Sequence, residues 1–198
     1  MMTFRFPSDE KISRFWQWFE QNAADLLDMA REDEQAARKK IDNRLKSLNR
    51  LLVPEVYYDP QAGKAVFVLS ADGIEQIFPV VEQVIGAAPD IPGWSFVAFR
   101  QPVDVKDVYV FEGHRYNLDD FRIQLEPADD GKVSVNVFVK DYDSYDYYKL
   151  LSVMFKIIND LLGEYLTVKK IAGVDIKPGF SQDLPSIATL PGMIDAKA

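Results

Sequence analysis

Residues 56–69 read VYYDPQAGKAVFVL and consist of two short apolar runs separated by a turn. Asp59-Pro60 and Gly63-Lys64 bracket the turn, and both pairs are typical of places where an extended chain reverses. The second run, residues 65–69, is apolar at consecutive positions, so both of its faces are expected to be buried. The segment therefore predicts a strand, a turn and a second strand in the middle of a sheet.

A helix and a third strand are expected to follow. Asp72 has the position of a helix cap, and apolar residues then recur at helical spacing. Pro79 falls inside this pattern, and because proline is costly in a helix interior it indicates a kink or a late start. Gly86 is expected to end the helix, and residues 94–99, WSFVAF, predict the third strand.

The same order recurs further along the chain. Residues 121–139 read FRIQLEPADDGKVSVNVFV, which again predicts a strand, an acid-Pro to Gly-Lys turn and a strand. We expect Asp143 to cap the next helix, Gly163 to end it and residues 165–168 to form the following strand. Two segments with one element order favour an internal duplication, with coincidence as the alternative.

The N-terminal quarter is predicted to be helical. Ser8, followed by two acids, marks a helix start, and apolar side chains then form a stripe on one side. A second helical pattern continues to Leu52, and one unbroken helix of that length would be unusual. We therefore expect a pair of helices over residues 8–52, with a break between Met29 and Glu34.

These elements define an α+β fold, in which the N-terminal helical pair packs with a mainly antiparallel sheet built from two ββαβ units. The length of 198 residues suits one compact domain over residues 1–198. Its expected parts are the helical pair over residues 8–52, the first ββαβ unit over 54–100, the second over 119–172 and an irregular tail over 175–198.

The composition restricts the chemistry. The chain has no cysteine, which excludes disulfides, thiolate metal sites and cysteine nucleophiles. It lacks the pattern of a signal peptide and an apolar run of membrane-spanning length, so we expect a soluble cytoplasmic protein with no membrane partner. The formal net charge of −8 predicts an acidic surface, which favours solubility and would attract a basic partner.

Positive charge is concentrated in residues 38–50, where six basic residues and one acid give a formal +5 against −13 for the rest of the chain. The basic residues spread over every side of the helix that the apolar stripe leaves open, which is typical of a solvated face. We therefore expect no nucleic-acid partner. The sequence also lacks a Gly-rich phosphate loop, so no cofactor is expected.

His114 is the only histidine and the one candidate for a general base near neutral pH. Asp119 and Asp120 lie close enough in the sequence to orient its ring, which is the basis of a hydrolase hypothesis. No Gly-x-Ser-x-Gly motif supplies a serine nucleophile, however. A turn histidine without a catalytic role is the simpler interpretation.

Three residues are candidates for binding. Arg100 and Gln101 follow the strand predicted over residues 94–99, where an arginine can hold a carboxylate or a phosphate. The alternative is a surface arginine leaving the sheet. Trp18 lies beyond the edge of the apolar stripe of the first helix, and an exposed tryptophan there would favour a protein interface. A wide buried face is the alternative.

No metal site is expected. Residues 141–146, DYDSYD, are rich in carboxylates, which calcium prefers as ligands. The EF-hand pattern fails at its glycine position and at its final glutamate position, where Ser152 stands. A helix cap is therefore the simpler account of these acids.

Three segments resemble a bacterial protein family of unknown function: FWQWFEQN at residues 15–22, SADG at 70–73 and GWSFVAFRQP at 93–102. The resemblance implies a fold and no activity. Because no catalytic motif is present, our hypothesis is a non-enzymatic interaction protein with a protein partner, for example one that neutralises a basic protein. A hydrolase that uses His114 with Asp119 or Asp120 is the alternative.

Overall fold

The computed structural model describes residues 6–195. The chain divides into two compact units, residues 1–100 (unit 1) and residues 101–198 (unit 2). Each unit holds a three-stranded sheet with helices, and unit 2 also holds a two-stranded sheet, so the α+β prediction is confirmed. A single domain over residues 1–198 stays a prediction.

Unit 1 contains three strands, β1 (Val53–Asp59), β2 (Lys64–Ser70) and β3 (Trp94–Ala98). Their order in the sheet is β1-β2-β3, so β2 is the central strand, as its two apolar faces predicted. β1 pairs antiparallel with β2, and β3 pairs parallel with it. Phe67 lies opposite Val56 on one side and Phe96 on the other, which places all three side chains on one face.

The helix that connects β2 to β3 starts late. A short 3-10 turn, η1 (Glu75–Ile77), precedes α4 (Phe78–Gly86), and Pro79 lies in the first turn of α4, where its missing N–H does no harm. The late start is therefore confirmed. The expected cap at Asp72 is wrong, because Asp72 has a left-handed backbone (φ 50°) and its carboxylate accepts a hydrogen bond from Arg100.

Three helices, instead of a pair, precede the sheet: α1 (Asp9–Gln21), α2 (Ala23–Glu32) and α3 (Glu34–Leu45). The expected break between Met29 and Glu34 lies at Asp33, whose side chain accepts a hydrogen bond from the Ala36 N–H and caps α3. A second break lies at Asn22. Its side-chain amide donates to the Trp18 carbonyl at 2.8 Å, and its backbone N–H donates to the Trp18 and Phe19 carbonyls, so Asn22 caps the end of α1.

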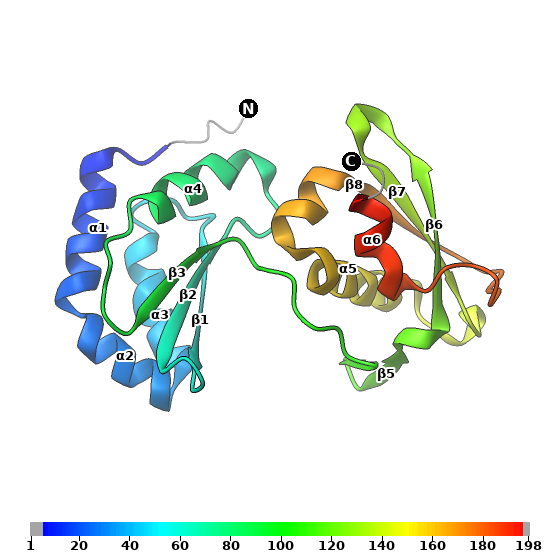
Figure 1. Cartoon of the computed structure of the whole chain (residues 1–198), viewed down its shortest axis with the longest axis horizontal. Coiled ribbons are helices and arrows are strands. Elements are labelled where there is room, and N and C mark those ends of the chain that lie inside the picture. Colours follow the sequence, from blue (N-terminus) through cyan, green and yellow to red (C-terminus); the bar gives the residue numbers. More distant parts are fainter. Residues whose placement is uncertain (1–5, 196–198) are drawn as a thin grey trace. The chain divides into compact units, whose positions relative to one another are not determined.

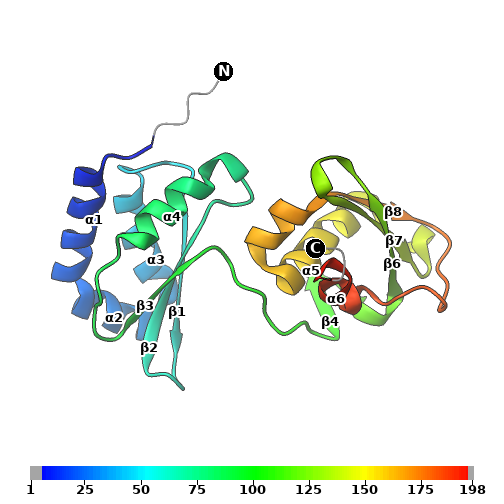
Figure 2. The ribbon, with the colours of Figure 1, turned by 45° about the horizontal axis from the view of Figure 1, so that its top comes forward.

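The helices of unit 1 cover the face of the sheet on which Phe67 projects (Figure 1, Figure 2). The centre of this core is a cluster of aromatic rings from α1, β2 and β3, namely Trp16, Phe19, Phe67, Trp94 and Phe96. Both indole N–H groups in the cluster are satisfied: that of Trp16 donates to the Val84 carbonyl and that of Trp94 to the Ala23 carbonyl. The cluster therefore ties α1, α2 and α4 to the sheet.

Unit 2 repeats the sheet of unit 1. Its strands are β6 (Phe121–Pro127), β7 (Val133–Val139) and β8 (Ile171–Lys177), in the order β6-β7-β8. Again the first pair is antiparallel and the second parallel. An aspartate with a left-handed backbone also stands two residues after each central strand, Asp72 in unit 1 and Asp141 in unit 2. These shared features support the internal duplication.

The helix of unit 2 differs from its predicted form. α5 (Tyr147–Lys170) is capped by Asp146 instead of Asp143, and the Asp146 carboxylate accepts a hydrogen bond from the Lys149 N–H. Gly163 has a non-helical backbone (φ 73°), so the first helical stretch of α5 ends there, as predicted, and a second stretch continues to Lys170. The strand expected over residues 165–168 is therefore wrong, because these residues lie in the last turns of α5 and the strand is β8.

Two further parts complete unit 2. The hairpin β4 (Val108–Phe111) and β5 (His114–Asn117) forms the two-stranded sheet. The tail is more ordered than predicted: it contains the end of β8, the 3-10 turn η5 (Ile187–Thr189) and α6 (Leu190–Asp195). The Ile123 N–H of β6 donates to the Pro185 carbonyl, and Leu190 is fully buried, so the tail closes the core of unit 2.

Candidate functional site

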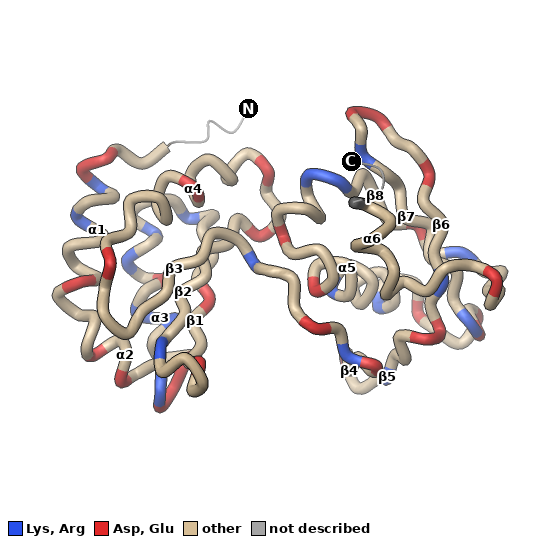
Figure 3. Tube along the Cα trace, viewed as in Figure 1, with Lys and Arg blue, Asp and Glu red and all other residues tan. Residues whose placement is uncertain are grey.

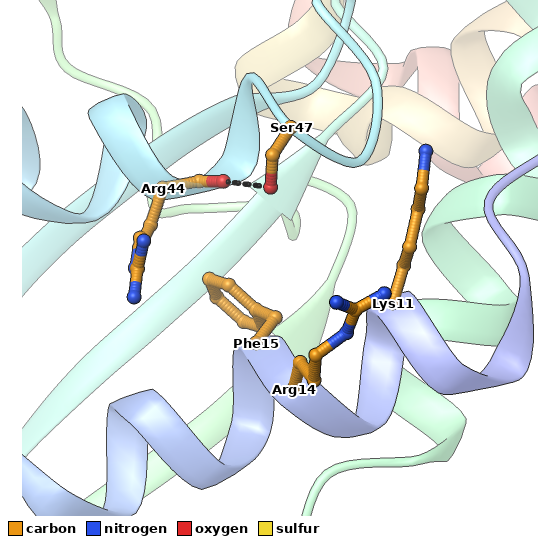
Figure 4. A pocket seen from close by; sticks show the side chains of 5 residues that line it. All are labelled: Lys11, Arg14, Phe15, Arg44 and Ser47. Carbon is orange, nitrogen blue, oxygen red and sulfur yellow. Dashed lines mark hydrogen bonds between the residues drawn. The ribbon is translucent and has the colours of Figure 1, made fainter.

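The best candidate for a functional site is a cavity between α1 and α3 in unit 1. Its volume is about 380 Å³, near the lower end of the range for small-ligand pockets. It is lined by Lys11, Arg14 and Phe15 from α1, by Arg44 from α3 and by Ser47 just after α3. Figure 4 shows Phe15 between Arg44 on one side and Lys11 and Arg14 on the other.

The helical repeat explains why these side chains meet. Lys11 and Arg14 are three residues apart, so they occupy one side of α1, while Phe15 belongs to the buried stripe and is only 4% exposed. Arg44 precedes Leu45, which is fully buried and holds the end of α3 in the core. The cavity therefore has an apolar floor and a rim of exposed basic side chains.

The cations around this cavity are poorly neutralised by the protein itself. Arg14 forms an exposed ion pair with Glu10 at 3.5 Å. Neither Lys11 nor Arg44 forms an ion pair with a carboxylate of the described residues 6–195. Figure 3 shows basic positions on both α1 and α3 in a unit that also carries many acidic ones. A positive cavity in an acidic chain is a place where an anion is held more favourably than elsewhere.

Trp18, a predicted interface residue, lies beside this cavity and is half-buried. The guanidinium of Arg44 lies over its ring, 5.4 Å from the ring centre, and its ring also contacts that of Phe15 at 6.1 Å. Arginine and tryptophan attract one another in this arrangement. Trp18 therefore widens the packing between α1 and α3 and also holds Arg44 at the cavity.

We expect Trp18→Ala to lower the free energy of unfolding of unit 1 by roughly 1–2 kcal/mol, between the 3–5 kcal/mol of a core aromatic and the 0.5 kcal/mol of a surface residue. Urea unfolding at low protein concentration, followed by tryptophan fluorescence, measures this loss. Gln17→Ala, at an exposed neighbouring position, is the control and should change little. A loss below about 0.5 kcal/mol would instead identify Trp18 as a free interface residue.

Arg100, a predicted binding residue, is held by two carboxylates of unit 1. Its guanidinium forms ion pairs with Glu55 on β1 and with Asp72, the latter at 3.0 Å. Phe99, just before it, has a left-handed backbone (φ 64°) and packs its ring 4.5 Å from that of Phe78. The cluster therefore fixes the chain where it leaves β3. Gln101 is exposed, and the structure does not place it at the cavity.

The hydrolase candidates lie in β5 and in the turn that follows it. His114 is exposed at the start of β5, after a turn formed by Glu112 and Gly113, and its Nδ1 lies 3.1 Å from the Glu112 carbonyl oxygen. Asp120 accepts a hydrogen bond from the Asn117 side chain. No hydrogen bond within residues 6–195 joins His114 to Asp119 or Asp120. The hydrolase hypothesis stays a prediction without a contact to support it.

Other kinds of site find little support in the part of the chain that the structure describes. There, no group of three or more His, Asp or Glu side chains is arranged to hold a metal ion. No helix among the described residues is both long and apolar enough to cross a bilayer. A second cavity of about 440 Å³, between α1 and α4, includes the carboxylates Asp9 and Glu20 and is therefore not a basic site.

The sequence signal for the α1–α3 cavity was incomplete. Residues 38–50 stood out as basic, but only Arg44 of that stretch lines the cavity. Lys11 and Arg14 gave no signal of their own, because two basic residues on an exposed helix side are ordinary. The packing of α1 against α3 brings the three cations around one space, and that packing cannot be read from either helix alone.

Comparison with known proteins adds no assignment. No protein-family model matches the chain, and neither a curated protein nor a solved structure shows significant similarity to it. The resemblance of residues 15–22, 70–73 and 93–102 to a bacterial family of unknown function stays a prediction.

Proposed function

We propose that the chain is a non-enzymatic binding protein that holds an anionic group of its partner in the cavity between α1 and α3. The observation that carries this proposal is that Lys11, Arg14 and Arg44 border one cavity, while Lys11 and Arg44 have no carboxylate partner within residues 6–195. An anion that enters the cavity supplies the missing charge and receives charge-assisted hydrogen bonds.

The proposal differs from the idea of neutralising a basic protein, which rests on the net charge of −8. Net charge acts at long range on the approach of a partner, whereas the cavity acts at contact. The positive charge around the cavity therefore favours an anionic group. The partner class we propose remains a protein, which would present that group on its surface.

Amide NMR shifts of the full chain, titrated at low ionic strength with sulfate and separately with acetate, test the proposal. We expect saturable shifts centred on Lys11, Arg14, Arg44 and Ser47. The triple variant K11Q/R14Q/R44Q should lose them, because it removes the cations and keeps the helical propensity of both helices. Salt should weaken binding, because the three cationic side chains are exposed.

A charge-matched control separates a site from a general effect of net charge. The triple variant R38Q/K39Q/R50Q also removes three positive charges from exposed positions of unit 1, and none of these residues lines the cavity. It should keep the localised shifts. Equal loss in both triple variants, or shifts that never saturate, would refute the proposal.

A further inference from the structure

The formal charge around the cavity between α1 and α3 exceeds what a carboxylate can neutralise. Three cations line the cavity, and the one carboxylate paired with them is Glu10, on Arg14, which leaves two positive charges unmatched among the described residues. A carboxylate brings a single negative charge. A dianion matches the remaining two, so charge balance favours a ligand such as phosphate.

The basic side chains reach the cavity from two helices. Arg44 stands on one side of Phe15, and Lys11 and Arg14 stand on the other (Figure 4). A carboxylate presents two oxygens in one plane, which suits a single arginine that binds both. A phosphate monoester presents three terminal oxygens in a tetrahedral arrangement, which can meet donors from both sides at once.

The end of α3 is arranged so that its carbonyl groups do not oppose an anion. Free carbonyl oxygens at a helix C-terminus carry partial negative charge. Here the Arg44 carbonyl accepts hydrogen bonds from both the N–H and the hydroxyl of Ser47, the latter at 2.8 Å. The Leu45 carbonyl accepts from the N–H groups of Leu48 and Asn49. These two carbonyl groups at the end of α3 are thus hydrogen-bonded, which reduces their repulsion of an anion in the cavity.

From these observations we infer that the cavity between α1 and α3 binds a phosphate monoester as its dianion. The inference rests on the proposed function and names the chemical class of the anionic group. Because the proposed partner is a protein, we expect the monoester on a phosphorylated side chain; a small-molecule monoester would present the same chemistry to the cavity, and the test distinguishes the two sources. A phosphodiester, with one charge and two free oxygens, fits less well.

The test compares the affinity of the full chain for five probes by NMR titration at low ionic strength. The probes are methyl phosphate, dimethyl phosphate, acetate, inorganic sulfate and a short phosphoserine peptide. We expect methyl phosphate to bind about tenfold more tightly than dimethyl phosphate or acetate, because a charge-assisted hydrogen bond contributes at least that factor. A peptide that binds more tightly than methyl phosphate would identify a protein as the source of the group.

The pH dependence gives an independent measure of the charge required. The second pKa of a phosphate monoester is about 6, so its affinity should rise between about pH 5 and about pH 7 as the dianion forms. Sulfate keeps its charge over this range, and its affinity should stay nearly constant. A monoester affinity as flat as that of sulfate would show that the second charge is not used.

Arg44→Gln should weaken methyl phosphate binding about tenfold, and Arg50→Gln, an exposed position that does not line the cavity, should leave it unchanged. Tryptophan fluorescence on urea unfolding checks that both variants are folded. The comparison of probes needs only the wild-type chain, so it tests the preference for a phosphate monoester even if a variant fails to fold.

The outcomes separate the two proposals. Equal affinity for methyl phosphate, dimethyl phosphate and acetate would overturn the inference and leave the proposed function standing. Tighter binding of dimethyl phosphate would overturn the inference in favour of nucleic acid or lipid headgroups. The absence of localised binding of any probe would overturn both.

Discussion

Phe19→Ala is expected to lower the free energy of unfolding of unit 1 by about 3–5 kcal/mol, which is a large part of the total stability of a typical domain. The Phe19 side chain is fully buried. Its ring lies 4.9 Å from that of Trp94 and 5.3 Å from that of Phe96, both in edge-on contact. Alanine leaves a cavity at the point where α1 contacts β3, and the surrounding rings cannot all close it.

Tryptophan fluorescence measures this loss in unit 1 specifically, because all three tryptophans of the chain, Trp16, Trp18 and Trp94, lie in unit 1. The midpoint of urea unfolding should fall strongly. Phe6→Ala is the matched control: the same substitution at a residue that is 58% exposed should stay within about 0.5 kcal/mol of wild type. A loss below about 2 kcal/mol for Phe19→Ala would contradict the aromatic core described for unit 1.

The same unfolding experiment tests whether the two units unfold independently of one another. Seven of the nine tyrosines follow residue 101, so tyrosine absorbance reports mainly on unit 2. If unit 2 unfolds at an unchanged midpoint in the Phe19→Ala variant, the units are separate folding units. If both midpoints move together, the chain unfolds as the single domain that its length suggests.

The parts of the fold that followed from the sequence are those set by local pattern. Consecutive apolar residues at 65–69 identified the central strand of unit 1, and Pro79 indicated the late start of α4. Both signals come from the residues themselves: apolar side chains on two faces need cover on both, and proline tolerates only the first turn of a helix. The repeated turn sequences likewise predicted two ββαβ units with the same element order, but they did not reveal that each unit forms a sheet of its own.

The parts that the sequence did not reveal depend on interactions between segments or on a single hydrogen bond. The break at Asn22 lies inside a continuous apolar stripe, so the pattern does not show it, and Asn22 ends α1 there with a side-chain bond to the Trp18 carbonyl. Residues 165–168 have strand-like side chains, yet they are helical, and Thr167 in this segment is buried and donates its hydroxyl proton to the Gly163 carbonyl. Packing and local bonding outweigh intrinsic propensity in both places.

For the candidate functional residues, too, the sequence showed one part and the structure another. Arg100 was recognisable from its place after a strand, but its two carboxylate partners are 45 and 28 residues away in the sequence and could not be predicted from it. The α1–α3 cavity, in contrast, could not be recognised from the sequence at all. Residues 11 and 44 lie far apart in the chain, and only the packed helices show that their charges face one space.

Tyr109 should make the stability of unit 2 depend on alkaline pH. Its side chain is 4% exposed, and burial, together with the nearby carboxylate of Asp160, raises the pKa of its hydroxyl to about 12. In the unfolded chain the pKa of tyrosine is about 10. A folded-state pKa above the unfolded value gives stability that is fully present below about pH 10 and is lost as the pH rises toward about 12.

The size of this effect follows from the shift of about two pKa units, which corresponds to roughly 2–3 kcal/mol. Urea unfolding of unit 2 at several values between about pH 9 and about pH 12, for wild type and for Tyr109→Phe, isolates it. Lysines and the other tyrosines titrate in the same range, but they contribute equally to both proteins, so the difference between the two curves belongs to Tyr109.

Tyr109→Phe should cost about 1 kcal/mol or less at neutral pH, because phenylalanine keeps the buried ring and loses only the contact of the hydroxyl with Asp160. Its stability should then fall less steeply than that of wild type above about pH 10. Asp160→Asn provides a second test: it removes the negative charge beside Tyr109 and should reduce the alkaline loss without abolishing it, because burial is the larger cause of the raised pKa. Parallel curves of unfolding free energy against pH for wild type and Tyr109→Phe would mean that the hydroxyl ionises as freely in the folded chain as in the unfolded one. That result would contradict the burial of the Tyr109 side chain.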